Sequence, residues 1–133
     1  AAALAPVPGG FVMWHSPGCQ CCLQWVKRME AAFGRKLPVV EAPDIAAVKK
    51  AQGVPGDLVS CHTALIQGYV VEGHVPPADI KRLIAARNRK IKGLAVPGMP
   101  VGAPGMEVPG SSEPYQVIAF GRDGKRNVFA RHG

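Results

Sequence analysis

The sequence lacks long apolar runs and has few aromatic residues. No stretch reaches the roughly 18 consecutive apolar residues that a membrane span needs. Aromatic residues make up 6% of the chain, and none is interleaved with the basic clusters as single-stranded nucleic-acid binding requires. We therefore expect neither a membrane span nor a nucleic-acid partner.

Acidic residues are also scarce. Nine Asp and Glu stand against sixteen Lys and Arg, so the formal net charge is +7. Basic clusters at 87–92 and 122–126 could attract phosphates. A solvated basic face is the simpler interpretation. The excess of positive charge would also offset the negative charge of thiolate groups bound to a metal, if the chain held any.

The length of 133 residues, 47% of them apolar, suits a single domain over 1–133 with a modest core. The opening segment 1–10 has neither the charged nor the long apolar region of a signal peptide, and we expect it to be flexible. A start in small residues is also what remains after a signal peptide is removed, which favours an exported protein.

Hydrophobic spacing and capping residues predict an α/β fold. The predicted elements are a strand at 11–15, a helix at 19–33, a strand at 37–40, a helix at 44–51, two antiparallel strands within 58–72 that turn at Gln67-Gly68, and a helix from Pro76 or Pro77 to about Arg89. This is the order of a thioredoxin-like domain with a mixed sheet. In such a domain, redox or metal cysteines lie at the first strand-to-helix junction.

The remainder of the chain differs in character. Residues 93–110 repeat Pro-Gly-Met, which predicts an extended, methionine-containing loop. Beyond it, 115–120 and 127–130 flank a glycine-containing turn and predict a closing β-hairpin.

Cysteine is the residue whose scarcity is most informative. The chain has four, and three of them form the run Cys19-Gln20-Cys21-Cys22 at the start of the first predicted helix. The free N–H groups and positive dipole at a helix start stabilise thiolates, which are nucleophiles and soft metal ligands. Cys19 and Cys22 would share one face of a regular helix, whereas Cys21 would point about 100° away from Cys22. Convergence of all three therefore needs loop geometry, or several metal ions that share sulfurs.

The fourth thiol, Cys61, precedes the predicted hairpin, where a thioredoxin-like architecture brings a loop beside the start of the first helix. His62 follows directly. Alternate side chains of an extended segment point oppositely, so Cys61 and His62 should not face one centre unless the loop is irregular. His74, just past the second hairpin strand, is the freer candidate ligand.

Met99 and Met106 are candidate thioether ligands, because they lie in Pro-Gly turns where periodicity predicts no buried face. Thioether sulfur favours Cu(I). Four cysteines would satisfy zinc, but zinc sites usually pair two separate CxxC knuckles, and an iron-sulfur cluster leaves methionine no role. The residues thus favour copper. Two alternatives stay open: structural disulfides or inert thiols, and a thiol-disulfide oxidoreductase in which Cys19 attacks and Cys22 resolves.

Several motifs carry a family resemblance. They are Ser16 to Cys22 with Trp25, Gly53 to Pro55, Ser60 to Ala64, Gly68 to Pro76, Gly93 to Pro100 and Pro104 to Glu107. Together they resemble the CopG-type bacterial copper-resistance proteins, a metal-binding family distinct from the plasmid repressor of the same name. The resemblance extends from Phe11 to His132.

The resemblance implies a thioredoxin-like fold, a periplasmic location and a cluster of several Cu(I) ions bridged by Cys19, Cys21, Cys22 and Cys61. It further implies that the protein holds copper or interconverts Cu(I) and Cu(II), alongside other resistance proteins or an electron carrier. Whether this makes it an enzyme is left open. Many members carry a histidine after the tryptophan of the first helix, where this chain has Arg28, so a further histidine-ligated copper at that place is doubtful.

Overall fold

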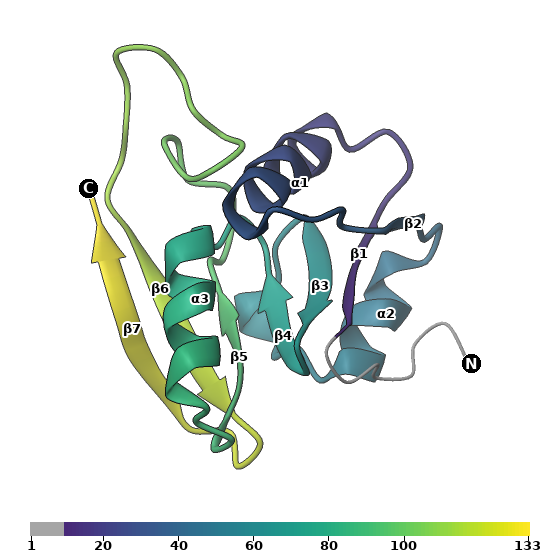
Figure 1. Cartoon of the computed structure of the whole chain (residues 1–133). Coiled ribbons are helices and arrows are strands. Elements are labelled where there is room, and N and C mark those ends of the chain that lie inside the picture. The colour runs from purple at the N-terminus through teal and green to yellow at the C-terminus, as the bar shows by residue number, and fades with distance from the viewer. Residues whose placement is uncertain (1–9) are drawn as a thin grey trace.

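A seven-stranded mixed sheet forms the centre of the protein (Figure 1). The structure is a computed structural model that describes residues 10–133, so the expected N-terminal segment 1–10 lies outside the described residues except for Gly10. The elements in chain order are β1 (Phe11–His15), α1 (Gln20–Phe33), β2 (Val39–Glu41), α2 (Ile45–Gln52), the 3-10 turn η2 (Gly56–Leu58), β3 (His62–Ile66), β4 (Tyr69–Glu72), α3 (Pro77–Ala86), β5 (Ile91–Ala95), β6 (Tyr115–Gly121) and β7 (Arg126–His132).

The strands lie in the order β2-β1-β3-β4-β5-β6-β7. β1 is parallel to β2 and β4 is parallel to β5, while the other neighbours are antiparallel. The predicted mixed sheet, the hairpin that turns at Gln67-Gly68 and the closing hairpin are confirmed.

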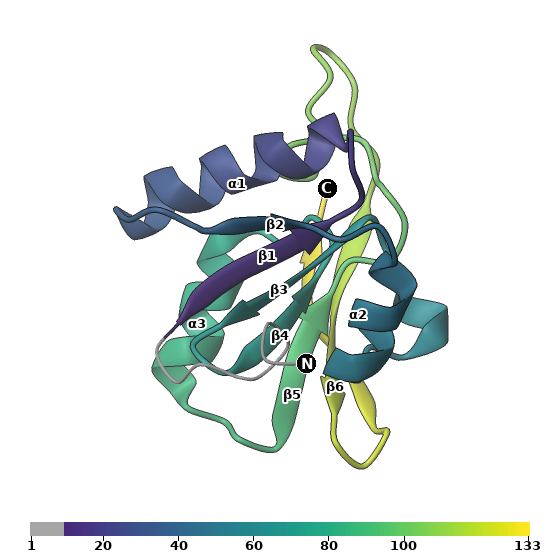
Figure 2. The same cartoon turned by 90° about the vertical axis from the view of Figure 1, so that its right-hand side faces the viewer.

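The helices cover both faces of the sheet (Figure 2). α1 and α3 pack on one face, where Trp25 and Leu83 share a core cluster with Met13 of β1. α2 covers the other face, where Val48 packs with Trp14. Neighbouring residues of β1 thus contribute to both cores, as the alternation of a strand requires.

α1 presents a continuous buried stripe to the sheet. Cys22, Trp25 and Met29 follow one another at helical spacing and are at most 1% exposed. Cys19 is the N-cap and has extended backbone angles, so the helix begins one residue later than the sequence predicts. Cys22 therefore faces the core, whereas Cys19 stands outside the helical register.

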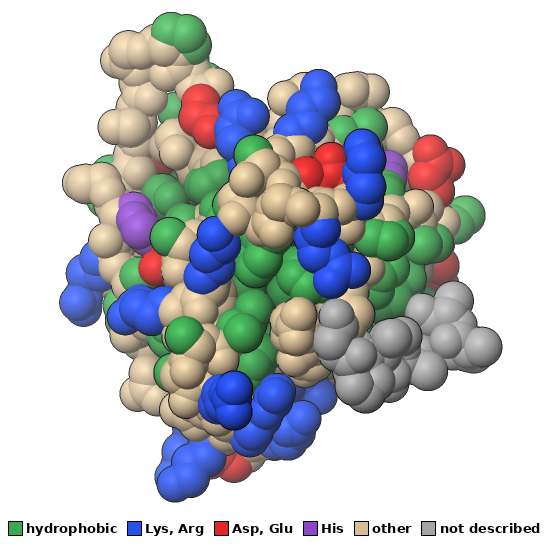
Figure 3. Space-filling model, in the orientation of Figure 1, with side chains coloured by type: hydrophobic (Ala, Val, Ile, Leu, Met, Phe, Trp, Pro, Cys, Tyr) green, Lys and Arg blue, Asp and Glu red, His purple; other side chains and the backbone are tan. Residues whose placement is uncertain are grey.

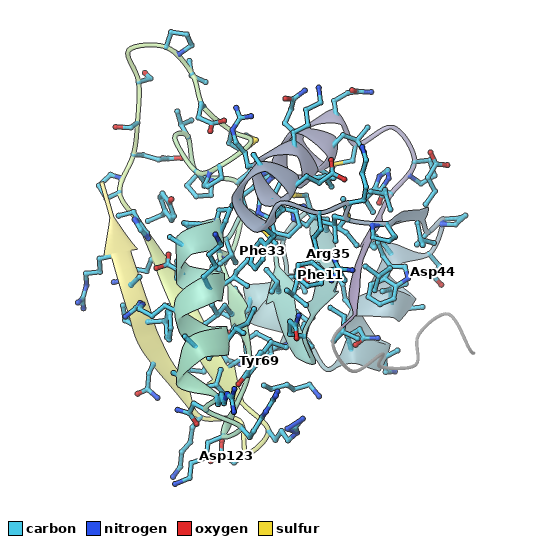
Figure 4. The ribbon with its side chains drawn as sticks, in the orientation of Figure 1. Phe11, Phe33, Arg35, Asp44, Tyr69 and Asp123 are labelled. Carbon is cyan, nitrogen blue, oxygen red and sulfur yellow. A yellow bond between two sulfur atoms is a disulfide. The ribbon has the colours of Figure 1, made fainter. Side chains whose placement is uncertain are left out.

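The far end of α1 is anchored by aromatic packing (Figure 4). The rings of Phe33 and Phe11 meet edge to face with centroids 5.2 Å apart, and the guanidinium of Arg35 lies 4.2 Å from the Phe11 centroid. Aromatic pairs of this kind stabilise by about 0.5–1.5 kcal/mol beyond their area burial. These contacts fix α1 on the sheet and so fix the position of its cysteine-bearing start.

The methionine loop is shorter than the predicted range 93–110, because residues 93–95 belong to β5. This strand lies inside the sheet, between β4 and β6. Gly93 has a low strand propensity, so the sequence does not predict a strand here. The sheet nevertheless requires a residue without a side chain at this position. A Cβ there would come within 2.1 Å of the Val70 carbonyl oxygen. The preceding helix correspondingly ends at Ala86 rather than near Arg89, with Arg87 in the left-handed region at φ 52°.

Lys and Arg side chains gather at the lower end of the face in Figure 3, where α3 leads into β5 and β6 turns into β7. Exposed basic residues of these two connections are Arg87, Arg89, Lys90, Arg122 and Lys125. The start of α1 lies at the opposite, upper end (Figure 1). Among residues 10–133, no helix combines the length and the apolar character needed to cross a bilayer.

Candidate metal centre

Three segments meet at the N-terminal end of α1. This end carries Cys19, Cys21 and Cys22, while Cys61 lies on the segment that leads into β3 and His74 follows β4. Because β3 and β4 are antiparallel neighbours, the start of one and the end of the other reach the same edge of the sheet. This topology brings distant parts of the chain to the cysteine run.

The four cysteine sulfurs are grouped closely. The Sγ atoms of Cys19, Cys21, Cys22 and Cys61 all lie within 4.8 Å of one another. Those of Cys19 and Cys21 are 3.5 Å apart. A regular helix would not allow this convergence. It becomes possible because Cys19 precedes the helix with extended backbone angles. Of the two routes to convergence that the sequence leaves open, loop geometry is present.

A disulfide joins Cys19 and Cys22, whose Cα atoms are 5.5 Å apart, while Cys21 and Cys61 are free thiols. The alternative of two structural disulfides is therefore wrong for this structure. In the disulfide state the centre offers two free sulfurs, and reduction of the single bond would offer four.

The Cys61 thiol is held in its neutral form. Burial, and secondarily the neighbouring Cys21, raise its pKa from 9.0 to about 12. The free thiol is thus protonated at neutral pH. A thiolate ligand must be deprotonated, so binding of a cation at Cys61 would release its proton.

Cys61 and His62 meet the exception to strand alternation, an irregular segment at Cys61. The Cys61 Sγ and the His62 Nδ1 are 3.2 Å apart. Strand alternation does not apply to this pair because β3 begins only at His62, and Cys61 belongs to the irregular segment before it. One ligand atom from each of Cys61, His62 and His74 also lies within 4.8 Å of the other two.

The two histidines at this centre are buried and neutral. His62 and His74 are both 0% exposed, and burial lowers the pKa of each below its ordinary value. The His74 Nδ1 lies 2.6 Å from the carbonyl oxygen of Pro104. A carbonyl only accepts, so Nδ1 carries the proton and Nε2 carries the lone pair. Among residues 10–133 the Nε2 atoms of both His62 and His74 are buried without a hydrogen-bond partner.

Trp25 fixes the position of the histidine pair from α1. Its ring centroid lies 4.5 Å from that of His62, and His62 and His74 meet edge to face at 5.0 Å. The indole Nε1 donates to the carbonyl oxygen of Val75 at 2.9 Å. Because its own polar group is satisfied, Trp25 acts as packing and not as a competing partner for the imidazoles.

The methionine loop closes over the start of α1 at Gly105. Its φ is 90°, and a Cβ on it would lie 2.8 Å from the backbone nitrogen of Trp25, 3.0 Å from the His74 Nδ1 and 3.1 Å from the carbonyl oxygen of Cys21. No side chain fits between the loop and the site, so glycine is required at this position.

Arg28 holds the same loop from the side. Its guanidinium donates two hydrogen bonds to the Glu107 carboxylate, at 3.1 and 3.3 Å. Slight burial alone would raise the pKa of Glu107, but these bonds and backbone N–H donors, including that of Gly105, outweigh it and lower the pKa. Arg28 therefore fixes the methionine loop against α1.

Neither predicted thioether ligand is deeply buried. Met99 is 48% exposed and lines a groove of about 480 Å³ with Pro114 and Tyr115. Met106 is half-buried beside Glu107. Both residues stay predictions as copper ligands.

Sequence reasoning missed a charged network behind Cys61. The Lys49 Nζ donates to the Glu72 carboxylate at 2.6 Å and to the Thr63 hydroxyl at 3.0 Å, and Thr63 donates to Glu72 at 2.6 Å. The same carboxylate accepts from the backbone N–H of Ser60 at 2.8 Å, next to Cys61. The sequence did hold one signal for this network: Glu72, an acidic residue at the end of the apolar run 69–72. A carboxylate buried in a strand needs a hydrogen-bonding or charged partner.

Comparison with known proteins gives matches of two kinds. A protein-family model described as "Protein of unknown function, DUF411" matches residues 58–106. Two solved structures match nearly the whole chain. One, entitled "Copper resistance protein copG- Form 2", is 43% identical with a TM-score of 0.86, over 96% of this chain and all of that chain. The other, "Copper resistance protein copG- Form 1", is 42% identical with a TM-score of 0.86, over 95% of this chain and 98% of that chain. No curated protein matches.

Proposed function

Because the chain belongs to the family of the copper resistance protein CopG, we propose that it binds copper for copper resistance, as a cysteine-bridged cluster of several Cu(I) ions. The cluster forms when Cys19 and Cys22 are reduced. All four thiolates, Cys19, Cys21, Cys22 and Cys61, then become ligands.

The observation that carries this proposal is the mutual approach of four cysteine sulfurs to within 4.8 Å. Thiolates are soft donors that select Cu(I), Zn or iron-sulfur clusters. The names of the related structures favour copper within this set. Sulfurs shared between ions allow more than one Cu(I) in so small a space, and the chain's positive net charge of +7 offsets the negative charge of such a cluster.

We also propose that the same dithiol interconverts Cu(I) and Cu(II). Oxidation of the Cys19 and Cys22 thiolates to a disulfide releases two electrons, which reduce two Cu(II) ions to two Cu(I) ions. The disulfide between these residues supports this proposal, because it shows that the two sulfurs can bond to each other. Return to the dithiol requires a two-electron donor, so an electron carrier or another resistance protein is the expected partner.

Three finer features belong to the same proposal. We infer a thioredoxin-like core from β1 to α3, because the parallel pair β1 and β2, the antiparallel pair β3 and β4 and helices on both faces follow that order. We place the protein in the periplasm, where relatives with this function would meet copper. We take the chain as one functional unit, because its seven strands join in one sheet.

The alternative, a thiol-disulfide oxidoreductase using Cys19 and Cys22, is not favoured. A dithiol exchanger needs two cysteines, whereas this centre groups four. The named relatives are copper resistance proteins. Cys21, which takes no part in the disulfide, distinguishes the two functions.

A Cys21→Ser variant therefore tests the proposal. Reduced wild-type and variant proteins are loaded with Cu(I) without oxygen, desalted, and compared for copper per chain and for insulin disulfide reduction. We expect Cys21→Ser to lose at least one copper per chain, and the exposed neighbouring change Gln20→Ser to lose none. Full copper loading in Cys21→Ser, combined with rapid insulin reduction by both proteins, would show a thiol exchanger instead.

A further inference from the structure

The end of the sheet opposite the candidate ligands carries a dense group of positive charges. Two connections form it, residues 87–90 between α3 and β5 and residues 122–125 between β6 and β7. The exposed cations of these connections, which together make up the basic end of the molecule, are Arg87, Arg89, Lys90, Arg122 and Lys125. Asp123 is the one acidic residue in the two connections.

We propose that the basic end binds the surface of an anionic phospholipid membrane and leaves the candidate metal centre facing away from that surface. The basic end contains none of the candidate ligands. The inference therefore stands independently of the proposed function.

The two connections lie side by side because the strands that adjoin them are paired. Ile91, the first residue of β5, is in register with Gly121, the last residue of β6. A Cβ on Gly121 would come within 3.0 Å of the Lys90 carbonyl oxygen. The Lys and Arg side chains accordingly gather at one end of the molecule in Figure 3. Cations on two adjacent loops at one tip can approach a plane together.

Hydrogen bonds hold both connections in fixed turns. The Asn88 side-chain oxygen accepts from the backbone N–H of Lys90 at 3.0 Å, and the Tyr69 hydroxyl donates to the Asn88 carbonyl oxygen at 3.2 Å. The Asp123 carboxylate accepts from the backbone N–H of Lys125 at 3.0 Å, so the one acid of the basic end serves its turn. Because the backbone is already ordered, binding through these loops carries little ordering cost.

A cavity between the connections offers donors for phosphate oxygens. It has a volume of about 300 Å³, and its lining includes Asn88 and Lys90 from one connection and Lys125 from the other. Hydrogen bonds from a charged amine to phosphate are stronger than those between neutral groups. Asp123 also lines the cavity, 3.9 Å from the Lys125 ammonium, but both side chains are more than half exposed and such a pair is weak.

The position of the basic end favours a membrane over a partner that exchanges copper or electrons. β5 begins in the basic end at Ile91 and runs parallel to β4, which leads to His74 at its far end. Five residues with a rise of about 3.3 Å each place roughly 15 Å between the two ends. A partner for copper or electrons must reach the candidate ligands, whereas a membrane surface need not.

Charge complementarity selects the class of lipid. Clusters of about four to eight Lys and Arg bind anionic lipid headgroups, because each cation is attracted while it lies within a Debye length of the surface. Residues 87–90 and 122–125 contain no aromatic side chain, which disfavours single-stranded nucleic acid. Val128, 40% exposed and close after the β6–β7 turn, adds an apolar side chain beside the cations.

Vesicle sedimentation tests the proposal with the full chain in its metal-free form. One set of vesicles contains equal parts of phosphatidylglycerol and phosphatidylcholine, and the other contains phosphatidylcholine alone. We expect wild-type protein to sediment with the anionic vesicles only. We expect it to be released in about 1 M salt, where the Debye length falls to about 3 Å.

A triple variant assigns the binding to the basic end. Lys90→Gln/Arg122→Gln/Lys125→Gln should raise the apparent Kd for the anionic vesicles at least tenfold. Arg87 and Arg89 stay unchanged, because Arg87 ends α3 in the left-handed region and the Arg89 guanidinium lies 4.8 Å from the Tyr69 ring centroid.

The matched control removes the same number of charges from exposed lysines elsewhere. Lys27→Gln/Lys36→Gln/Lys50→Gln should change the apparent Kd by less than about threefold, because these side chains lie outside the basic end. Circular dichroism establishes that both variants are folded.

Three results would overturn the inference. Folded wild-type protein that does not bind the anionic vesicles would show that the basic end is only solvated. Equal weakening by the two triple variants would show an effect of net charge without a defined surface. Tighter binding of soluble polyglutamate than of the vesicles, at equal concentration of anionic groups, would show a surface for an acidic protein instead.

Discussion

At the scale of single residues, Gly105 decides how closely the methionine loop approaches the candidate metal centre. Gly105→Ala places a Cβ against backbone atoms of Trp25 and Cys21 that cannot move without shifting α1. A left-handed non-glycine residue alone costs about 1–2 kcal/mol. We expect Gly105→Ala to lower the free energy of unfolding by about 3 kcal/mol or more, because the contacts add to that cost. Urea unfolding measures it.

Gly110→Ala is the matched control for this change. Gly110 also has a positive φ, 74°, but a Cβ there would meet nothing within 4 Å. It should show the left-handed penalty alone, about 1–2 kcal/mol. Equal losses in the two variants would mean that the loop does not press on the start of α1.

The ion pair of Arg28 and Glu107 gives a prediction about pH. The pKa of Glu107 is lowered, so the pair contributes fully above the ordinary carboxyl value of 4.5 and is lost as the pH falls through the lowered pKa. We expect an NMR titration of the Glu107 carboxyl to give a midpoint below 4.5, and Arg28→Ala to raise it. Both side chains are nearly half exposed, so the pair is worth at most about 1 kcal/mol. An unchanged midpoint in Arg28→Ala would contradict the contact.

The sequence identifies the donors better than their orientation. Residue type and spacing were enough to predict that the four cysteines lie together, which the structure shows, and to name His74 as a candidate beside them. The direction of His62 was not predictable, since it depends on where β3 begins, a matter of one residue. The Lys49 and Glu72 pair was missed for a different reason: its two members are distant in the chain and meet only through the sheet.

At the scale of elements, this pair joins α2 to the central strands β3 and β4. Glu72 is 0% exposed and Lys49 is 8% exposed. Removing one partner of a buried pair leaves an uncompensated charge, at a cost of about 3–5 kcal/mol. We therefore expect Glu72→Gln to destabilise the protein by about that amount in urea unfolding. The exposed pair of Lys125 and Asp123 supplies the control.

Asp123→Asn, which breaks the exposed pair, should change stability by less than about 1 kcal/mol. If Glu72→Gln were as mild as Asp123→Asn, the network behind Cys61 would not be a fixed support of the site.

Element boundaries were predictable wherever a local cap sets them. Asp44 accepts from the backbone N–H of Ala47, and Gly34 and Gly53 end their helices in the left-handed region, all readable from sequence. β5 was not readable. Its residues include Lys92 and Gly93, which favour a loop locally. The parallel pairing with β4 and the antiparallel pairing with β6 make it a strand, and Gly93 allows the close approach of Val70.

At the scale of the whole molecule, the candidate ligands and one group of exposed basic residues lie at opposite ends of the sheet. The donors gather where α1 begins and β3 begins, and the exposed basic residues gather near the turn between β6 and β7 (Figures 1 and 3). The first follows from topology, because three chain segments end at one edge of the sheet. The methionine loop between β5 and β6 then covers that edge, held by Arg28 and by the fit of Gly105.

We propose that the four sulfurs act together as a site for more than one copper ion. The most direct measurement is an anaerobic Cu(I) titration of the fully reduced protein, with copper and thiols counted in the same desalted sample. We expect more than one retained copper per chain for the wild type, and a lower count for Cys61→Ser. One copper or none per chain, with all four thiols found reduced, would contradict it.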